Sequence, residues 1–493
     1  MRRSSGVVVS LSTAMGLPAM AANEGLQLCV FDSRRGHQEG QELDKILFFF
    51  PSDFPYSVQL SVVGLSEGII TFTRIFSPDA ACEVIEEERH SHVFYQAEPD
   101  IWMVMIAEKN KDNESDWRCD ALIDVLKEAH SLFTMFNDSL QALLDKQPSG
   151  ELARSRLYTF INDYLSDFYV GKKIQVPSFR DCLKERRTVQ MLTVSREVAI
   201  EVQSLATVIG ISSLGSIACK SLILFQDLLV ATTLSPGDTA NMFTYAVLRS
   251  SPEEYHRGSH DSSMGEQSNR YHMPRPLQRD NWSKGKDGFL VCDNQLNVGG
   301  LVYLAPVVWL QESEEHMYLC IYQHRSLTII VLIPVCSQTD GEQGIALVKK
   351  QLLENASEKI VHVEEKLSRG WGGENAYHVS GYRYLLVDTD KSISRTSPPG
   401  KVMTLAKDSL FTLNKLREAI DLEKTRANRE KPDHEKYLEV CIRAKNNSWI
   451  IAKVTQGREL YMVIERANET LLYASDAVEK FSDRYCDGAF SLD

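Results

Sequence analysis

The order of the expected secondary-structure elements repeats three times along this chain, and that order restricts the fold more than any motif does. Each pass reads strand, strand, helix, three strands, helix, judged from alternating apolar residues and from helical spacing. Consecutive strands joined by short turns pair antiparallel, whereas a doubly wound nucleotide-binding fold alternates strand and helix. The order therefore predicts an α/β protein with three small domains, each a mostly antiparallel five-stranded sheet with helices packed on its faces.

Shifts in composition place the domain boundaries. The stretch 249–288 is polar, mixes both charges and holds few apolar residues, which is typical of a disordered insert. The start of the chain is weakly apolar and broken by polar residues, so we expect a disordered tail, with a processed targeting peptide as the alternative. The predicted parts are a tail (1–25), a first domain (26–150), a helical extension (151–196), a second domain (197–370, with the insert) and a third domain (371–493).

The helix expected at 56–76 carries more apolar surface than one core needs. One line of residues at helical spacing is the expected core-facing stripe, and a second apolar line lies well away from it. Between them runs a strip of small residues that includes two glycines, which cost a helix about 1 kcal/mol each. The first line is Val58, Val62, Leu65, Ile69, Phe72 and Phe76; the second is Leu60, Val63 and Ile70; the strip is Ser57, Ser61, Gly64 and Gly68.

Two interpretations of that second line remain open. It could contact another protein chain, or the helix could lie between two layers of its own fold. The three phenylalanines at 48–50 pose the same question, because side chains alternate along a strand and Phe49 is expected to point away from its neighbours, to a helix layer or to a partner. The candidate contact residues are Phe49, Pro51, Asp53, Phe54, Ser57, Leu60, Ser61, Val63, Gly64, Gly68 and Ile70.

Composition argues against several classes of function. The chain of 493 residues has a formal net charge of -13, and phosphate-backbone binding needs a dense basic surface, so nucleic acid is not an expected partner. Its 10 cysteines show no paired or metal-type spacing, which fits a reducing compartment. No stretch of the sequence resembles a transmembrane helix.

No motif supports covalent catalysis. The glycines at 210 and 215 precede Lys220 by too many residues for a phosphate loop, and no nucleophile elbow is present. His90 and His92 could share a face of a strand, but no further ligand stands at a recognisable spacing, so we expect solvent-facing histidines. We therefore expect no catalytic residues, no metal and no cofactor. A hydrolase with a triad built from distant residues is the alternative from another class.

The opening of the first domain resembles a known family. The segments 28–40 (LCVFDSRRGHQEG) and 44–53 (DKILFFFPSD) are similar to the first longin domain of the Ccz subunit of the Mon–Ccz complex. The agreement in element order extends over about residues 26–493. The resemblance implies three longin domains in one half of a heterodimer with a Mon-type subunit of the same architecture.

The same resemblance implies a function. The complex would be a guanine-nucleotide exchange factor for a late-endosomal Rab GTPase of the Rab-seven type, acting in endosome maturation and vacuole or lysosome fusion. The protein would be cytoplasmic and recruited peripherally to late-endosomal and vacuolar membranes through the complex. It would not be an enzyme by itself. The alternative is a longin-type trafficking adaptor or tethering-complex scaffold without exchange activity.

Overall fold

The computed structural model divides the chain into two compact units, one of which holds the described residues up to 170 and the other those from 188 onward. Each unit is considered by itself. The structure describes residues 7–10, 26–77, 82–108, 119–170, 188–192, 194, 196–210, 219–249, 282–285, 287–292, 305–335, 341–372, 382–396, 408–409, 411–413, 415–417, 419–420, 423, 438–455, 457–464 and 470–485.

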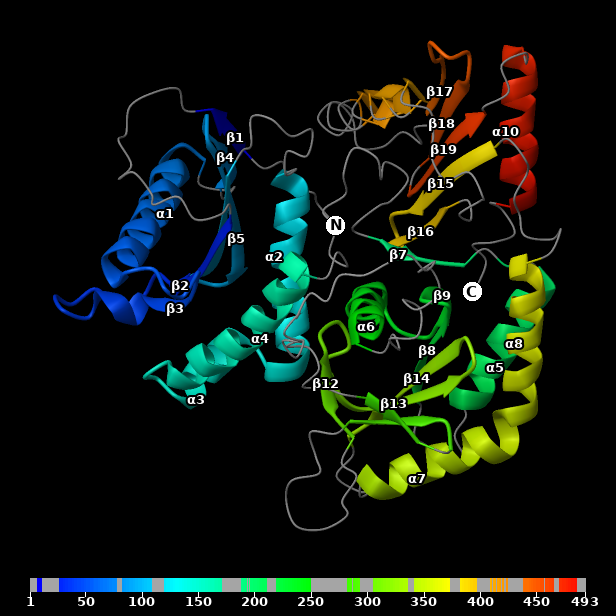
Figure 1. The fold of residues 1–493 in the computed structure, drawn as a ribbon, viewed down its shortest axis with the longest axis horizontal. Coiled ribbons are helices and arrows are strands. Elements are labelled where there is room, and N and C mark those ends of the chain that lie inside the picture. The colour runs from blue at the N-terminus through cyan, green and yellow to red at the C-terminus, as the bar shows by residue number, and fades with distance from the viewer. Residues whose placement is uncertain are drawn as a thin grey trace, which may run out of the picture. The chain divides into compact units, whose positions relative to one another are not determined.

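The first unit has the predicted order of strands and helices (Figure 1). Its sheet runs β1-β4-β5-β6-β2-β3, and the chain-adjacent strands pair antiparallel. After β6 the chain forms three helices. The elements are β2 (Leu26–Asp32), a 3₁₀ turn (Glu42–Lys45), β3 (Ile46–Phe50), α1 (Tyr56–Phe76), β4 (Cys82–Glu86), β5 (His90–Glu98), β6 (Ile101–Glu108), α2 (Cys119–Asn137), α3 (Leu140–Lys146) and α4 (Glu151–Val170).

Helices cover both faces of this sheet, and the phenylalanines of β3 show why. Phe48 is buried with its ring 4.8 Å from that of Tyr158 on α4, whereas Phe49 is buried among core residues on the α1 side. Side chains that alternate along a strand thus meet a different helix layer on each face. Arg154 fixes α4 to the sheet, since its guanidinium donates to the carbonyl oxygens of Ile46 and Asp44. The predicted helical extension therefore belongs to the first unit as far as Val170.

One short strand was not expected. β1 (Val7–Ser10) pairs parallel with β4, inside the segment predicted to be a disordered tail, so the prediction is wrong for these four residues. Three consecutive valines favour extended pairing with an open sheet edge. The rest of the predicted tail lies outside the described residues.

The second sheet has the order β10-β11-β13-β14-β8-β9, with β12 also paired to β13. One face of the second sheet is covered by α5 and by the continuous helical segment 341–372, and their apolar residues share one core. Residues of α6 are buried as well. The elements are α5 (Arg196–Gly210), β8 (Lys220–Phe225), β9 (Leu228–Thr232), α6 (Pro236–Arg249), β10 (Trp282–Lys284), β11 (Phe289–Cys292), β12 (Val307–Leu310), β13 (Glu315–His324), β14 (Leu327–Pro334), α7 (Gly341–Gln351), a π-helical turn (Leu352–Ala356) and α8 (Ser357–Gly372).

The predicted insert at 249–288 is corrected at its C-terminal end, where β10 pairs antiparallel with β11. Most of the insert lies outside the described residues. β13 and β14 form a hairpin, since they pair along their length with Arg325 in the left-handed region at the turn.

The third sheet has the order β17-β18-β19-β15-β16-β7. The described residues of 408–420 are helical and pack on one face, and α10 packs on the other. The second strand of its sequence repeat is β16, which pairs with β15. The elements are β7 (Val189–Gln190), β15 (Tyr382–Asp388), β16 (Ile393–Thr396), β17 (Leu438–Arg443), β18 (Trp449–Thr455), β19 (Arg458–Ile464) and α10 (Leu471–Tyr485).

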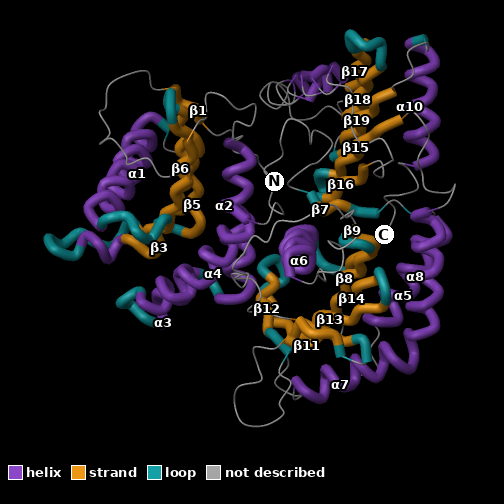
Figure 2. The backbone as a smooth tube through the Cα atoms, viewed as in Figure 1, coloured by secondary structure: helices purple, strands orange, loops and turns teal. Residues whose placement is uncertain are grey.

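Figure 2 separates the strands of the three sheets from the helices beside them. The five repeat strands of each sheet follow the same order. In each, the last strand of the sequence repeat pairs antiparallel with the first, which are β6 with β2, β14 with β8, and β19 with β15. Each sheet also has more than the five predicted strands, because β1, β7 and β10 extend an edge. Three longin-like α/β domains are thereby confirmed. Among the described residues, no helix has both the length and the apolarity needed to cross a lipid bilayer.

Candidate protein-interaction surface

The core-facing side of α1 lies between the two predicted apolar lines and takes residues from both. Val62, Val63 and Ile70 are buried in the core that α1 forms with its sheet. Two polar residues on this side are buried as well: Gln59 donates to the carbonyl oxygen of Phe54 at 2.7 Å, and Ser66 donates to that of Val62 at 2.8 Å. Because both side chains donate hydrogen bonds to backbone carbonyl oxygens, their polar groups can be buried without a large energetic penalty. The second apolar line therefore faces the core.

Three candidate contact residues are thereby corrected. Phe49, Val63 and Ile70 are at most 4% exposed and lie beneath other parts of the same domain, so they present no surface to another chain. Leu60 is half-buried and packs against the same core. These residues pack within their own domain, but α1 does not lie between two layers of the fold, because its other side is exposed.

The exposed side of α1 combines the small residues with large apolar ones. Ser57, Ser61, Gly64 and Gly68 are all exposed, and a Cβ built on either glycine meets no atom within 4 Å. At helical spacing this strip continues toward the C-terminal end of the helix, where three large side chains are exposed. These are Phe72 (57%), Ile75 (70%) and Phe76 (74%).

All three were missed as surface residues in the sequence pattern: Phe72 and Phe76 were assigned to the core, and Ile75 was assigned to neither apolar line. Their rings contact each other with centroids 5.0 Å apart. Exposed aromatic and aliphatic side chains on one helix face, beside a strip with no protruding side chains, form a surface suited to close contact with another backbone. We call Ser57, Ser61, Gly64, Gly68, Phe72, Ile75 and Phe76 the outer face of α1.

The segment before α1 contributes little exposed surface of its own. Phe54 is half-buried with its ring 6.1 Å from Phe49. Pro51 is half-buried and Asp53 is exposed, so of the candidates in this segment Asp53 is the best placed to meet a partner.

Charged groups flank the outer face without covering it. Lys45 forms an ion pair with Glu67 at 2.6 Å on one side of α1. Two turns further along the same side of α1, the guanidinium of Arg74 lies 5.3 Å from the ring centroid of Trp102. Both are held in place by their own domain, so the outer face offers packing more than charge.

The groups that could have carried chemistry are occupied with structural contacts. Lys220 lies in β8 and donates to Glu315 at 2.8 Å, so it is not part of a phosphate loop. Burial raises the pKa of the Cys29 and Cys320 thiols to about 12, which keeps both protonated at neutral pH. Within the described residues, no group of three or more His, Cys, Asp or Glu could hold a metal ion.

The expectation of a solvent-facing His92 is wrong. His92 is 3% exposed, and its ring lies 6.4 Å from that of Phe94, which belongs to the core under α1. Burial, with a smaller effect of His90, lowers the pKa of His92 to about 4. This histidine is a neutral core residue at physiological pH.

Comparison with known proteins agrees with the fold. A family model described as the first longin domain of INTU, CCZ1 and HPS4 matches residues 26–138, the span from β2 through α2. Over 97% of this chain, 63% of residues are identical to a vacuolar fusion protein CCZ1 homolog of Oryza sativa subsp. japonica, matched over its full length. Identity to the homolog B of Arabidopsis thaliana is 57%, over 97% of this chain and all of that protein. A homolog of Xenopus laevis is 23% identical over 95% of this chain and 97% of its own length.

The fold and the matched domain define a protein of three longin domains. The chain belongs to the family of vacuolar fusion protein CCZ1 homologs.

Proposed function

We propose that this protein is one subunit of a heterodimeric guanine-nucleotide exchange factor that activates a late-endosomal Rab GTPase of the Rab-seven type. The observation that carries the proposal is its extensive identity, over nearly the whole chain, to proteins named for vacuolar fusion. The second subunit is a Mon-type protein of three longin domains. The complex acts in endosome maturation and fusion with the vacuole, and it recruits the protein peripherally to those membranes.

An exchange factor needs no nucleophile or metal ion of its own. It stabilises the nucleotide-free GTPase by displacing the segments that hold magnesium and phosphate, so its work is done by surfaces. The chemistry-bearing side chains considered above have structural partners or are buried, which is compatible with such a role.

We assign the outer face of α1 to a contact in which the first longin domains of the two subunits pair and together bind the Rab GTPase. Its exposed apolar residues gain from burial, at about 25 cal/mol per Å² of apolar area. Its glycines allow another backbone to approach closely, and they have no packing function within the described part of this chain. Asp53 lies just before the same helix, and we assign it to the rim of the contact.

The proposal is tested with the co-expressed Mon-type subunit and a Rab-seven-type GTPase loaded with a fluorescent GDP analogue. The complex should accelerate nucleotide release strongly, and the chain alone should not. Ser61→Arg and Gly68→Arg place a long cation on the outer face and should prevent both complex formation and exchange. Ser155→Arg, the same substitution at an exposed position of α4, is the matched control and should behave as wild type.

Two results would contradict the proposal at different points. A complex that forms but never accelerates release would favour the adaptor or scaffold without exchange activity. Normal complex formation by the Gly68→Arg variant would show that the outer face of α1 is not the contact.

A further inference from the structure

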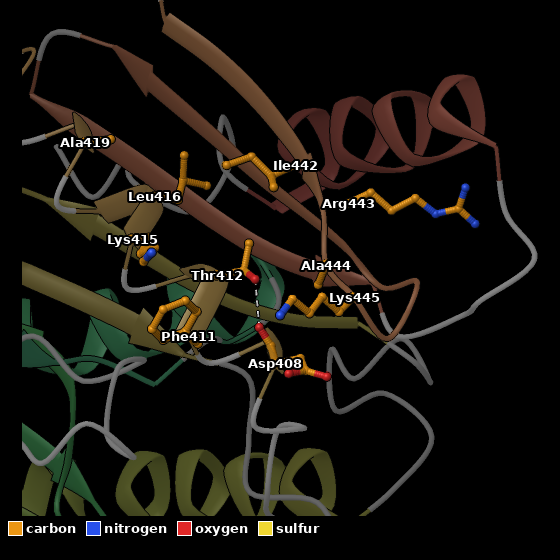
Figure 3. A pocket seen from close by; sticks show the side chains of 10 residues that line it. All are labelled: Asp408, Phe411, Thr412, Lys415, Leu416, Ala419, Ile442, Arg443, Ala444 and Lys445. Atoms are coloured by element: carbon orange, nitrogen blue, oxygen red, sulfur yellow. Dashed lines mark hydrogen bonds between the residues drawn. The ribbon is translucent and has the colours of Figure 1, made fainter. Parts of the chain in front are cut away.

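The cavity of the third domain lacks fixed polar groups. It measures about 290 Å³ and lies between β17 and the helical residues of 408–420 (Figure 3). Thr412 donates to the backbone carbonyl oxygen of Asp408 at 2.7 Å. The charged side chains of the lining are all exposed, namely those of Asp408, Lys415, Arg443 and Lys445. A small-molecule site needs polar groups that are held in place to orient the ligand, whereas the backbone groups of a strand edge are held by the sheet itself.

The pairing of β1 with β4 differs from the other pairings described in the first sheet. It is parallel and four residues long, whereas β2 with β3, β2 with β6, β4 with β5 and β5 with β6 are antiparallel. Its register shifts between Val7 and Val8, which lie opposite Cys82 and Val84, so Glu83 has no residue of β1 opposite it. Parallel ladders are slightly less stable per residue than antiparallel ones, so β1 is held weakly.

No turn holds β1 on its edge. β10, which extends the second sheet, is joined to β11 by a tight turn in which Gly288 donates to the carbonyl oxygen of Gly285. In contrast, residues 11–25 separate β1 from β2, and β2 is separated from β4 in the sheet by β5 and β6. Closing such a long connection costs entropy, so the backbone pairing itself is what keeps β1 on the edge.

The edge that β1 covers lies near the end of α1 that carries exposed apolar side chains. α1 ends at Phe76 and β4 begins at Cys82. Ile70, in the last two turns of α1, is buried in one core with Cys82. Phe72, Ile75 and Phe76 are exposed at this end of the helix. Backbone pairing at the edge can therefore supply affinity to an extended segment, and contacts with these side chains can supply specificity.

We propose that the outer edge of β4 is a strand-docking site and that β1 is its internal occupant, which an extended segment of a partner protein replaces. β1 shows which kind of segment fits, because it is uncharged, rich in β-branched residues and parallel to β4. Residues of the partner segment beyond the paired ones contact the exposed end of α1. Release of β1 controls access to the edge. The inference does not rest on nucleotide exchange, because the chain alone suffices to test it.

A disulfide across the pairing tests whether β1 occupies the edge. Ser10 and Glu86 lie opposite each other, so the variant Ser10→Cys with Glu86→Cys can be oxidised to lock β1 on β4. The probe is labelled Ser-Gly-Val-Val-Val-Ser-Leu-Ser, the sequence of residues 5–12, and its binding to the full chain is followed by fluorescence anisotropy. The oxidised variant should bind the probe at least about tenfold more weakly than the same sample after reduction. The wild-type chain, taken through the same oxidation and reduction, is the control for the native cysteines and should not change.

A second variant removes the internal occupant. Successive N–H groups of a strand point to opposite edges, so Val8→Pro with Val9→Pro removes the one that faces β4. This variant should bind the probe at least about tenfold more tightly than wild type, because a tethered strand competes at an effective concentration in the millimolar range. Val8→Thr with Val9→Thr keeps both N–H groups and the β-branched shape, so it is the matched control and should behave as wild type. By hydrogen exchange, the amides of residues 82–86 should exchange faster in the proline variant and be protected again by the probe.

Four results would overturn the proposal. The first is failure of the proline variant to bind the probe at millimolar concentration, and the second is equal binding by the oxidised and reduced cysteine variant. The third is binding of a probe with proline at the positions of Val8 and Val9 as tightly as the unchanged probe, since backbone pairing would then not be involved. The fourth is a wild-type dimer, detected by light scattering and abolished in the proline variant, because β1 would then bind a second copy of the chain.

Discussion

Replacing Gly64 and Gly68 by alanine should stabilise α1 while weakening the complex. Both glycines are exposed within a regular helix, and a Cβ at either position meets no atom within 4 Å. Alanine is favoured over glycine inside a helix by about 1 kcal/mol, so the double variant should gain about 2 kcal/mol. Because every 1.4 kcal/mol is a factor of ten, amides of α1 that exchange by local opening should exchange about 30-fold more slowly.

The assay is hydrogen exchange on the full chain, followed for peptides that cover 56–76, with α4 as the internal reference. Exchange that is unchanged or faster would refute the reasoning, since it would mean that the glycines are needed by the fold itself. The second measurement is affinity for the Mon-type subunit. A methyl group inserted into a close backbone contact costs about 1–3 kcal/mol, so on our proposal the same variant should bind more weakly. A gain in both quantities would remove the glycine strip from the interface.

Three further predictions concern the first domain. The pKa of His92 is about 4 in the folded protein and 6.5 in the unfolded chain, so its contribution to stability is complete above pH 6.5 and should fall by about 3 kcal/mol toward pH 4. The free energy of unfolding, measured by urea titration, should therefore change less with pH over this range in the His92→Leu variant than in the wild type. Burial alone would raise the pKa of Glu98, but hydrogen bonds from His130 and from the backbone amides of Gln141 and Leu140 lower it. Stability should therefore be lost as the pH falls through the lowered pKa, and Glu98→Gln should reduce the free energy of unfolding in urea by about 1.5–3 kcal/mol. Val63→Asp should destabilise the domain by more than about 3 kcal/mol, whereas Ser61→Asp, two residues away on the exposed side, should change its unfolding midpoint little.

The order of the elements was predictable because long strands and helices repeat their apolar residues many times. β5, β6, β13 and β14 each have eight or more residues, and all four were expected. The strands that extend the sheets were not predicted, since β1, β7 and β10 have two to four residues and no alternation to detect. Their pairing is decided by which sheet edge is open.

β16 was hard to recognise in the sequence for a different reason. Its polar composition, with Ser394 and Arg395, is typical of a connecting loop. Both residues are at most 3% exposed, and the strand begins directly after Ser392, which takes the left-handed conformation of a turn. Tertiary pairing with β15 on one side and β7 on the other thus overrides composition.

The two sides of α1 could not be told apart from apolar residues alone. Both lines hold large aliphatic side chains, and the aromatic residues at 72 and 76 favoured the first line alone, although the core takes residues from both lines. The core-facing side carries Gln59 and Ser66, whose polar groups are satisfied by backbone carbonyl oxygens of their own neighbourhood. A hydrophobicity pattern counts such residues as surface, so it assigns the helix face that they occupy to solvent.

The short stretch around β7 has a consequence for how the C-terminal unit can be divided. Val189 and Met191 donate backbone hydrogen bonds to Ser392 and Ser394 of the third sheet, and the next residue, Leu192, donates to Leu229 of the second. Residues 189–192 therefore connect the second and third sheets by backbone hydrogen bonds, although they precede the other strands of both sheets in the chain. A recombinant fragment that starts at residue 197, the predicted domain border, would lack residues 189–192 and would expose an edge of each sheet. Fragments intended to report on either domain should start before residue 188, and the two domains should then unfold as one cooperative block.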